Sequence, residues 1–159
     1  MAATIDAMDG IAKAAGARLQ DAALTDDISF LLARANALSL AAGNAALAPH
    51  RLRARSYSVL ELAAGGARPT QRDLAEFLRL DPSQVVALVD ELQGQGLVAR
   101  ETDPADRRTK VVVATPLGRE VCEAARAAAT AAEQTLHAGI SGHERELLVD
   151  LLRRLAFPA

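Results

Sequence analysis

Three basic side chains lie within four positions, at Arg107, Arg108 and Lys110. Short β-branched runs on either side, at 97–100 and 110–113, predict the two strands of a β-hairpin. The connection is too long for a two-residue turn, so we expect it to project as a loop that carries the cations. Such a loop suits the phosphates of a nucleic acid or a narrow minor groove, although most charge runs are simply solvated.

Two short helices joined by a tight turn are predicted just before this hairpin. The first begins with Thr70 and Asp73 at the spacing of a capping box. The second is predicted over 82–94, with Asp81 as its N-cap and Gln84 at the capping-box position. Two helices and a hairpin in this order predict a winged helix-turn-helix.

Longer helices are predicted on both sides of this unit. Apolar residues at helical spacing indicate helices over 26–48 and about 50–63 before it, and over about 116–138 after it. A last helix starts after Ser141 and carries the most apolar stripe in the chain, Leu147, Leu148, Leu151, Leu152 and Leu155. Residues 1–24 have a weaker stripe and form either a tail or an extra helix.

The composition limits the class of protein. The 159 residues are half hydrophobic but only 3% aromatic, so one domain with a core of Leu, Val and Ala is expected. A net charge of −2 argues against a general DNA coat but leaves room for a local basic region. The single Cys suggests a reducing compartment, and no run approaches 18 apolar residues. We therefore expect a cytoplasmic protein without membrane insertion.

No catalytic or metal-binding pattern emerges. His50, His137 and His143 are scattered, and no Ser-His-Asp set, carboxylate pair or phosphate-binding Gly loop is present. We expect no enzyme activity, no cofactor and no metal. Cys122 is expected to be a buried structural thiol.

The run from Thr70 to Gly118 resembles the MarR family of bacterial transcription regulators. The Asp-x-Arg of the family's wing falls on Asp106 and Arg108, and Thr115 and Gly118 match the motif that closes the wing. The resemblance covers about residues 26–157.

This resemblance implies a mainly α fold with a small β-hairpin wing. The chain would then consist of an N-terminal extension (1–24) and a MarR-type domain (25–157). Within that domain, 50–114 would be the winged-helix DNA-binding lobe, and 25–48 with 116–157 would form a helical dimerisation region.

The resemblance also implies roles for single residues. Arg108 would enter the minor groove, the helix over 82–94 would lie in the major groove, and Asp106 would hold a basic side chain in place. That helix has no Lys or Arg, whereas family members often carry an Arg near Ala87, and residues 68–110 contain seven basic and eight acidic residues. Base contacts would then rest on Ser83, Gln84 and on Val85 or Ala87 against thymine methyls. The expected DNA-contacting residues are Thr70, Gln71, Ser83, Gln84, Val85, Ala87, Arg107, Arg108 and Lys110.

The resulting hypothesis is a homodimeric repressor that binds a palindromic operator in double-stranded DNA. Family members often bind small aromatic ligands, which here would use a pocket near Leu38, His50, Arg53 and Tyr57 and relieve repression. His50 and Arg53 could pair with an anion there, so a small aromatic or anionic effector is expected. The alternative is a dimeric ligand- or protein-binding module with weak or lost DNA specificity. The absence of basic residues from the second short helix favours the alternative, and the basic wing tip opposes it.

Overall fold

The computed structural model describes Leu19 and residues 22–158. Most of the predicted extension over 1–24 therefore lies outside the described residues. The chain divides into two compact units, residues 1–39 and 40–159. In the first unit, the 3-10 helix η1 (Ala23–Asp26) precedes α2 (Ile28–Leu47), which continues into the second unit.

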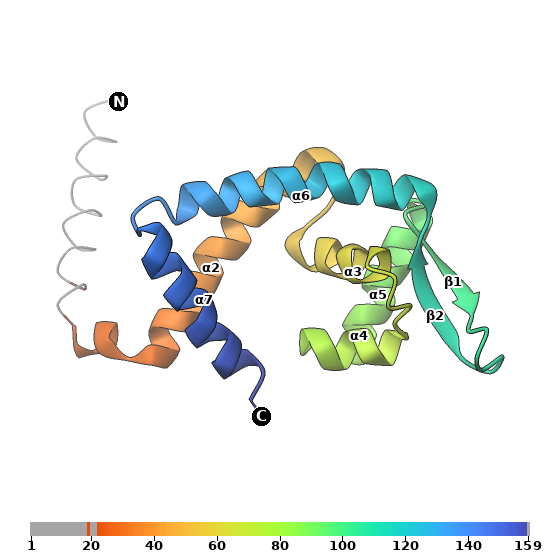
Figure 1. Cartoon of the computed structure of the whole chain (residues 1–159), viewed down its shortest axis with the longest axis horizontal. Helices are drawn as coiled ribbons and strands as arrows, with labels where there is room; N and C mark the ends of the chain where they lie inside the picture. Colours follow the sequence, from red (N-terminus) through yellow and green to blue (C-terminus); the bar gives the residue numbers. More distant parts are fainter. Residues whose placement is uncertain (1–18, 20–21, 159) are drawn as a thin grey trace, which may run out of the picture. The chain divides into compact units, whose positions relative to one another are not determined.

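The second unit holds the remaining elements, with the hairpin loop projecting away from the helices (Figure 1). They are η2 (Ala48–His50), α3 (Ala54–Ala64), α4 (Gln71–Leu78), α5 (Pro82–Gly94), β1 (Val98–Thr102), β2 (Lys110–Ala114), α6 (Pro116–Leu136) and α7 (Gly142–Ala156). This order confirms the predicted mainly α fold with one two-stranded hairpin.

Helix α3 begins later than the sequence predicts, at Ala54 instead of about residue 50. The chain first makes the 3-10 turn η2, and Arg51 then adopts a left-handed conformation with φ 57°. Oδ1 of Asn44 accepts a hydrogen bond from the N–H of Ala54 at 2.8 Å, and Oγ of Ser56 accepts one from the N–H of Arg53 at 2.9 Å. These side chains satisfy N–H groups that a helix start leaves free, which fixes where α3 begins.

The predicted capping box of α4 is confirmed. Oγ1 of Thr70 accepts from the N–H of Asp73 at 3.1 Å, and Oδ2 of Asp73 accepts from the N–H of Thr70 at 2.8 Å. Asp81 caps α5, as predicted, but its carboxylate accepts from the N–H of Ser83 at 2.9 Å, so the capping box predicted with Gln84 is not formed. The N–H of Ser83, two positions after the cap, donates to the Asp81 carboxylate, and the N–H of Gln84, three positions after it, does not.

The wing is a regular antiparallel hairpin that is tied to α4. Val98 pairs with Ala114 and Thr102 with Lys110 at its two ends. The N–H of Val112 donates to the carbonyl of Pro69 at 2.8 Å, and Thr70 forms an isolated bridge with Val111. The start of α4 is therefore hydrogen-bonded directly to the wing.

The core of the second unit lies among α3, α4, α5 and the hairpin, and α6 covers it along α3. The burial of Cys122 in α6, at 1% exposed, confirms the prediction of a buried thiol. The largest fully buried side chains of this core are Leu47, Leu60, Leu74, Leu92, Val59, Val85, Val89, Val98 and Val112.

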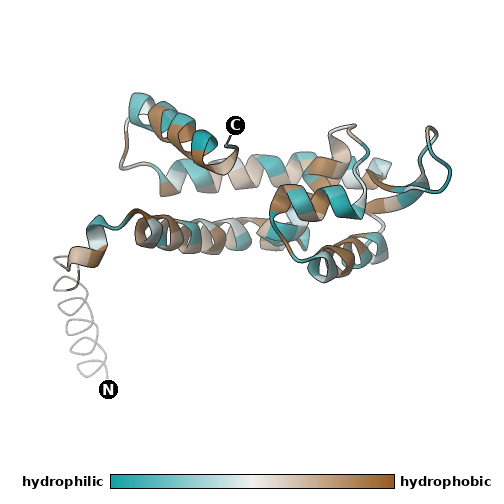
Figure 2. Cartoon of the chain, turned by 90° about the horizontal axis from the view of Figure 1, so that it is seen from below, coloured by the Kyte–Doolittle hydropathy of each residue, from teal (hydrophilic) through white to brown (hydrophobic). Residues whose placement is uncertain are grey.

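Helices α2 and α7 leave apolar side chains exposed, among them Ile28, Leu147 and Leu155. Both helices carry hydrophobic segments, drawn brown in Figure 2. In α7 no residue is buried, and only Leu47 is buried in α2. The segment Ile28–His50 has the length and mean hydropathy, 1.2, of a membrane-crossing helix, with 6% of its most apolar window buried. The sequence prediction counted unbroken apolar runs, and this segment is broken by Arg34, Asn36 and Asn44.

Candidate nucleic-acid interface

One side of α5 is buried in the core and the other is exposed. Val85, Val89 and Leu92 face inward at 0% exposed, whereas Ser83 and Ala87 are exposed. The predicted contact between Val85 and a thymine methyl is therefore wrong, because the Val85 side chain is fully buried in the core. The spacing i, i+4, i+7 of the three buried residues was the sequence signal that could have shown this.

Val86, and not Val85, is the large apolar residue that α5 exposes, at 41%. Gln84 is exposed as well, whereas the Ser83 hydroxyl already donates to Oδ1 of Asp81 at 2.6 Å. The exposed side of α5 therefore carries polar and acidic residues, including Gln84 and Asp90, but no basic residue of its own.

Thr70 and Gln71 lie at the start of α4, as predicted, but both side chains already form hydrogen bonds within the protein. The Thr70 hydroxyl donates to Oδ2 of Asp73 at 2.8 Å. Oε1 of Gln71 accepts from Nη2 of Arg100 at 2.7 Å. What this helix start can offer a phosphate is mainly its free backbone N–H groups.

The wing tip gathers exposed cations on an ordered loop. The N–H of Asp103 donates to the carbonyl of Thr109 at 3.0 Å, which closes the loop onto the strands. Arg107 and Arg108 are exposed, and neither makes an ion pair with any residue that the structure describes. Lys110 donates from Nζ to Oγ1 of Thr102 at 2.7 Å. The two arginines are free to meet an anionic partner.

Asp106 stabilises the wing in a different way from the one predicted. Its Oδ1 accepts from the backbone N–H of Arg108 at 3.0 Å, and its Oδ2 accepts from Oγ1 of Thr109 at 2.8 Å. These two hydrogen bonds lower the pKa of Asp106. The carboxylate thus holds the backbone of the turn and leaves the Arg108 guanidinium free, because the side chain of a turn Asp reaches the N–H two residues later.

Ion pairs occupy three of the seven basic residues between 68 and 110. Arg68 pairs with Glu101 and Arg72 with Glu76, each at 2.9 Å, and Arg100 pairs with Asp90. Among the described residues, the basic side chains of this segment without an ion pair are Arg79, Arg107, Arg108 and Lys110. Three of these four lie at the wing, so the available positive charge is concentrated there despite the acidic total.

A polar cluster between α3 and α6 was missed in the sequence. Oε1 of Glu61 accepts from Nη2 of Arg126 at 2.7 Å, and Oε2 accepts from Sγ of Cys122 at 3.1 Å. Arg126 also pairs with Glu123 at 2.6 Å, and Tyr57 hydrogen-bonds Glu61. Glu61 lies 61 positions from Cys122 and 65 from Arg126, so the spacing gave no signal for the contacts between the two helices. The cluster joins the helix-turn-helix lobe to α6.

The contacts within this cluster change the pKa values of Tyr57, Glu61 and Cys122. Burial, then the hydrogen bond and charge of Glu61, raise the pKa values of Tyr57 and of Cys122 to about 12 each. The Cys122 thiol is therefore protonated and a poor nucleophile near neutral pH. Burial alone would raise the pKa of Glu61, but hydrogen bonds from Arg126, Cys122 and Tyr57 outweigh it and lower the pKa.

A pH-dependent stability follows for Glu61. A carboxyl group whose pKa is lowered on folding stabilises the protein above its unfolded pKa, and this stabilisation is lost as the pH falls through the folded value. We expect Glu61→Gln to lower Tm at about pH 7, and the difference from the unaltered protein to shrink below about pH 4. Thermal melting across this range measures it, with exposed Glu120→Gln as the control. A Tm difference that is constant with pH would contradict the assignment.

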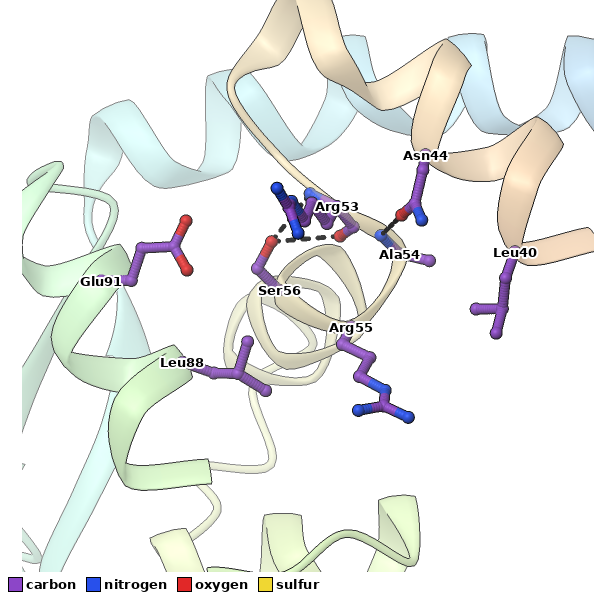
Figure 3. Close-up of a pocket in the computed structure, with 8 residues that line it drawn as sticks. All are labelled: Leu40, Asn44, Arg53, Ala54, Arg55, Ser56, Leu88 and Glu91. Carbon is purple, nitrogen blue, oxygen red and sulfur yellow. Dashed lines mark hydrogen bonds between the residues drawn. The ribbon is translucent and has the colours of Figure 1, made fainter. Parts of the chain in front are cut away.

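A pocket of about 550 Å³ opens beside the start of α3 (Figure 3). Of the four residues predicted for a ligand pocket, Arg53 lines this one, whereas Leu38, His50 and Tyr57 do not. The predicted pocket was placed by family resemblance between the dimerisation helices and the DNA-binding lobe, whereas this pocket lies around the start of α3. Its lining residues are Leu40, Asn44, Arg53, Ala54, Arg55, Ser56, Leu88 and Glu91.

Comparison with known proteins places the chain among transcriptional regulators. The MarR family model matches residues 53–109. The chain is 33% identical over 99 residues to a putative transcriptional regulatory protein for the hcr operon of Thauera aromatica, covering 62% of this chain and 60% of that relative. This match spans less than two thirds of the relative's length.

Solved structures match more of the chain. A MarR-family transcriptional regulator from Rhodococcus sp. RHA1 is 46% identical with a TM-score of 0.81, covering 86% of this chain and 97% of that one. CouR from Rhodococcus jostii RHA1 bound to p-coumaroyl-CoA is 47% identical with a TM-score of 0.80, covering 86% and 96%. A transcriptional repressor, CouR, bound to a 23-mer DNA duplex is 28% identical with a TM-score of 0.76, covering 84% and 95%.

The winged helix-turn-helix and these similarities together define the class of protein. The chain belongs to the MarR family of transcriptional regulators.

Proposed function

We propose that this chain is a sequence-specific DNA-binding repressor that acts as a homodimer on a palindromic operator. The observation that carries the proposal is the ordered wing tip, where Arg107 and Arg108 are exposed without an ion pair to any described residue. The likeness to a CouR repressor bound to a DNA duplex supports it. Two-fold symmetry would then set the half-sites about 10 bp apart, centre to centre.

In this proposal the wing and α5 contact different parts of the DNA. Arg108 enters the minor groove, and Arg107 and Lys110 contact phosphates. The backbone N–H of Gln71 at the start of α4 adds a further phosphate contact, whereas the N–H of Thr70 is already bonded to Asp73. The exposed side of α5 enters the major groove with Ser83, Gln84, Val86 and Ala87. Because this side has no Lys or Arg to contact guanine, minor-groove width contributes much of the sequence preference.

Selection from a library of random-sequence DNA duplexes tests the DNA-binding part. The purified protein is expected to enrich an inverted repeat whose affinity falls steeply with salt, since each neutralised phosphate releases counterions. Selection that yields no common sequence would reject the repressor. It would favour the alternative of a dimeric ligand- or protein-binding module, which the exposed acidic residues Asp90 and Glu91 on α5 also suit.

A second copy of the chain is proposed to cover the exposed apolar faces. MarR-family regulators are dimeric. The described parts of the first unit expose Ile28 and Leu31 on α2, and the second exposes Leu147, Leu151 and Leu155 on α7, at 43% or more for each. Apolar surface of this extent is costly in water and is typical of a protein interface. Residues 25–48 and 116–157 would thus form the dimerisation region and 50–114 the DNA-binding lobe.

We assign the pocket beside α3 to an anionic effector with an apolar or aromatic part, of the acyl-CoA thioester class. Arg53 and Arg55 line it without ion pairs to described residues, and Leu40 and Leu88 provide apolar surface. The likeness to CouR bound to p-coumaroyl-CoA supports this class. Because the pocket lies between α2, α3 and α5, a ligand there can alter the position of α5 and release DNA.

Addition of p-coumaroyl-CoA, p-coumarate or coenzyme A, each separately, tests the effector class. The thioester is expected to raise Tm and to release the selected duplex more effectively than either half, because binding to the folded state alone stabilises it. Arg53→Gln and Arg55→Gln should weaken both effects. If none of the three compounds shifts Tm or releases DNA, the effector class is rejected while DNA binding stands.

The proposed location and the absence of catalysis follow from the family. Regulators that bind chromosomal DNA work in the cytoplasm, and we place this chain there. We assign it no enzymatic activity, because its relatives are named as transcriptional regulators.

A further inference from the structure

Arg100, in β1, joins side chains from α4 and α5. Its Nε and Nη2 donate to Oε1 of Gln71 at 3.2 and 2.7 Å, and its Nη1 donates to Oε1 of Gln93 at 2.8 Å. Nη2 also donates to Oδ1 of Asp90 at 2.5 Å. An arginine side chain has five N–H donors, and these bonds engage four of them. The Arg100 side chain is 27% exposed, so it is held within the lobe.

The carboxylate that Arg100 pairs with lies on the exposed side of α5. Asp90 follows Ser83 and Ala87 at the i+7 and i+3 positions, which places all three on one helix face. The Asp90 side chain is 60% exposed. An unpaired carboxylate on this face would repel DNA phosphates, and α5 itself has no basic residue to oppose it.

We propose that Arg100 is a positioning residue for DNA recognition, which fixes α5 against α4 and the wing and neutralises Asp90 without itself contacting phosphate. This inference rests on the DNA binding proposed above. The three acceptors come from two helices, and a strand supplies the guanidinium. Without Arg100, α5 loses its hydrogen-bonded link to α4 and the wing. The Asp90 carboxylate is then left unpaired on the side of α5 that faces DNA.

The test uses the duplex selected by the unaltered protein and a scrambled duplex of the same composition. Arg100→Lys keeps the charge, but one ammonium group cannot span acceptors on two helices. We expect both Arg100→Lys and Arg100→Ala to lower the preference for the selected duplex by about 10-fold, judged from hydrogen bonds to charged groups. The dependence of affinity on salt should stay as in the unaltered protein. A phosphate contact would behave differently, since Lys would restore binding and Ala would lower the salt slope by about 1.

A double variant separates positioning from general damage. Asp90→Ala added to Arg100→Ala should recover part of the operator affinity, because the stranded carboxylate is removed. Arg72→Ala, which breaks an exposed pair with Glu76 on α4, is the control for losing one positive charge in the same lobe. If Arg100→Ala does not fold, Arg100→Lys and Asp90→Ala decide the question, with Asp90→Ala expected to lower the preference for the selected duplex.

Two failures are distinguishable. If the unaltered protein does not prefer the selected duplex, the proposed DNA-binding function is overturned and the role of Arg100 with it. If the unaltered protein prefers it and the Arg100 variants keep the same preference, only the positioning role is overturned.

Discussion

Gly118→Ala is expected to destabilise the fold strongly, because α6 passes close to the backbone of Leu97 at this position. A Cβ at Gly118 would lie 1.9 Å from the carbonyl oxygen and 2.8 Å from the carbonyl carbon of Leu97. Leu97 is 4% exposed, and its carbonyl accepts from the N–H of Thr115 at 3.0 Å, so the backbone there cannot yield easily. We expect a loss of about 3 kcal/mol in the free energy of unfolding, at the upper end of the usual cost of overpacking.

Gly94→Ala is the matched control for this prediction. Gly94 ends α5, and a Cβ there would meet nothing within 4 Å. Because Ala favours a helix over Gly, this variant should melt at or slightly above the Tm of the unaltered protein. Thermal and urea unfolding of both variants measure the difference. A Gly118→Ala protein that unfolds like Gly94→Ala would show that α6 does not pass so close to the segment before β1.

Arg108→Ala is expected to have the largest effect on DNA binding among the wing residues. Its side chain is exposed at the tip, and its backbone N–H is held by Asp106, so the guanidinium is presented on a fixed turn. We expect operator affinity to fall by about 10-fold or more, in line with about 1–3 kcal/mol for a good groove contact. Tm should not change, because the side chain has no partner in the described part of the lobe.

Arg72→Ala controls for the loss of one positive charge. Arg72 lies on α4 in an exposed i,i+4 pair with Glu76, and pairs of this kind contribute little to stability. Fluorescence anisotropy on the selected duplex at several salt concentrations compares the two variants. Equal affinities for Arg108→Ala and the unaltered protein would remove the wing from the recognition mechanism.

The sequence predicted those parts of the fold that depend on neighbours along the chain. The caps at Thr70, Asp81 and Ser141 act within three residues, and each is visible as a short pattern. The hairpin follows from β-branched runs around a turn. Local hydrogen bonding and side-chain alternation are sufficient to specify these elements.

The parts that the sequence did not predict depend on residues far apart in the chain. Arg100 was counted only as a cation, because Gln71 lies 29 positions away and nothing in the spacing links them. Glu61 and Arg126 are 65 positions apart, and the start of α3 depends on Asn44 ten positions earlier. Val85 was misassigned for a different reason, since two adjacent valines at 85 and 86 left the buried side of α5 ambiguous until Val89 and Leu92 were taken together.

Recovery of fragmented host genomic DNA by the purified protein tests the central claim most directly. The protein would be incubated with excess non-specific DNA, beside Arg108→Ala, at two salt concentrations. We predict enrichment of a few fragments that share the inverted repeat found by selection and that are lost with Arg108→Ala. Weak and uniform recovery that disappears with salt, equally for both proteins, would mean only non-specific phosphate binding and would contradict a sequence-specific repressor.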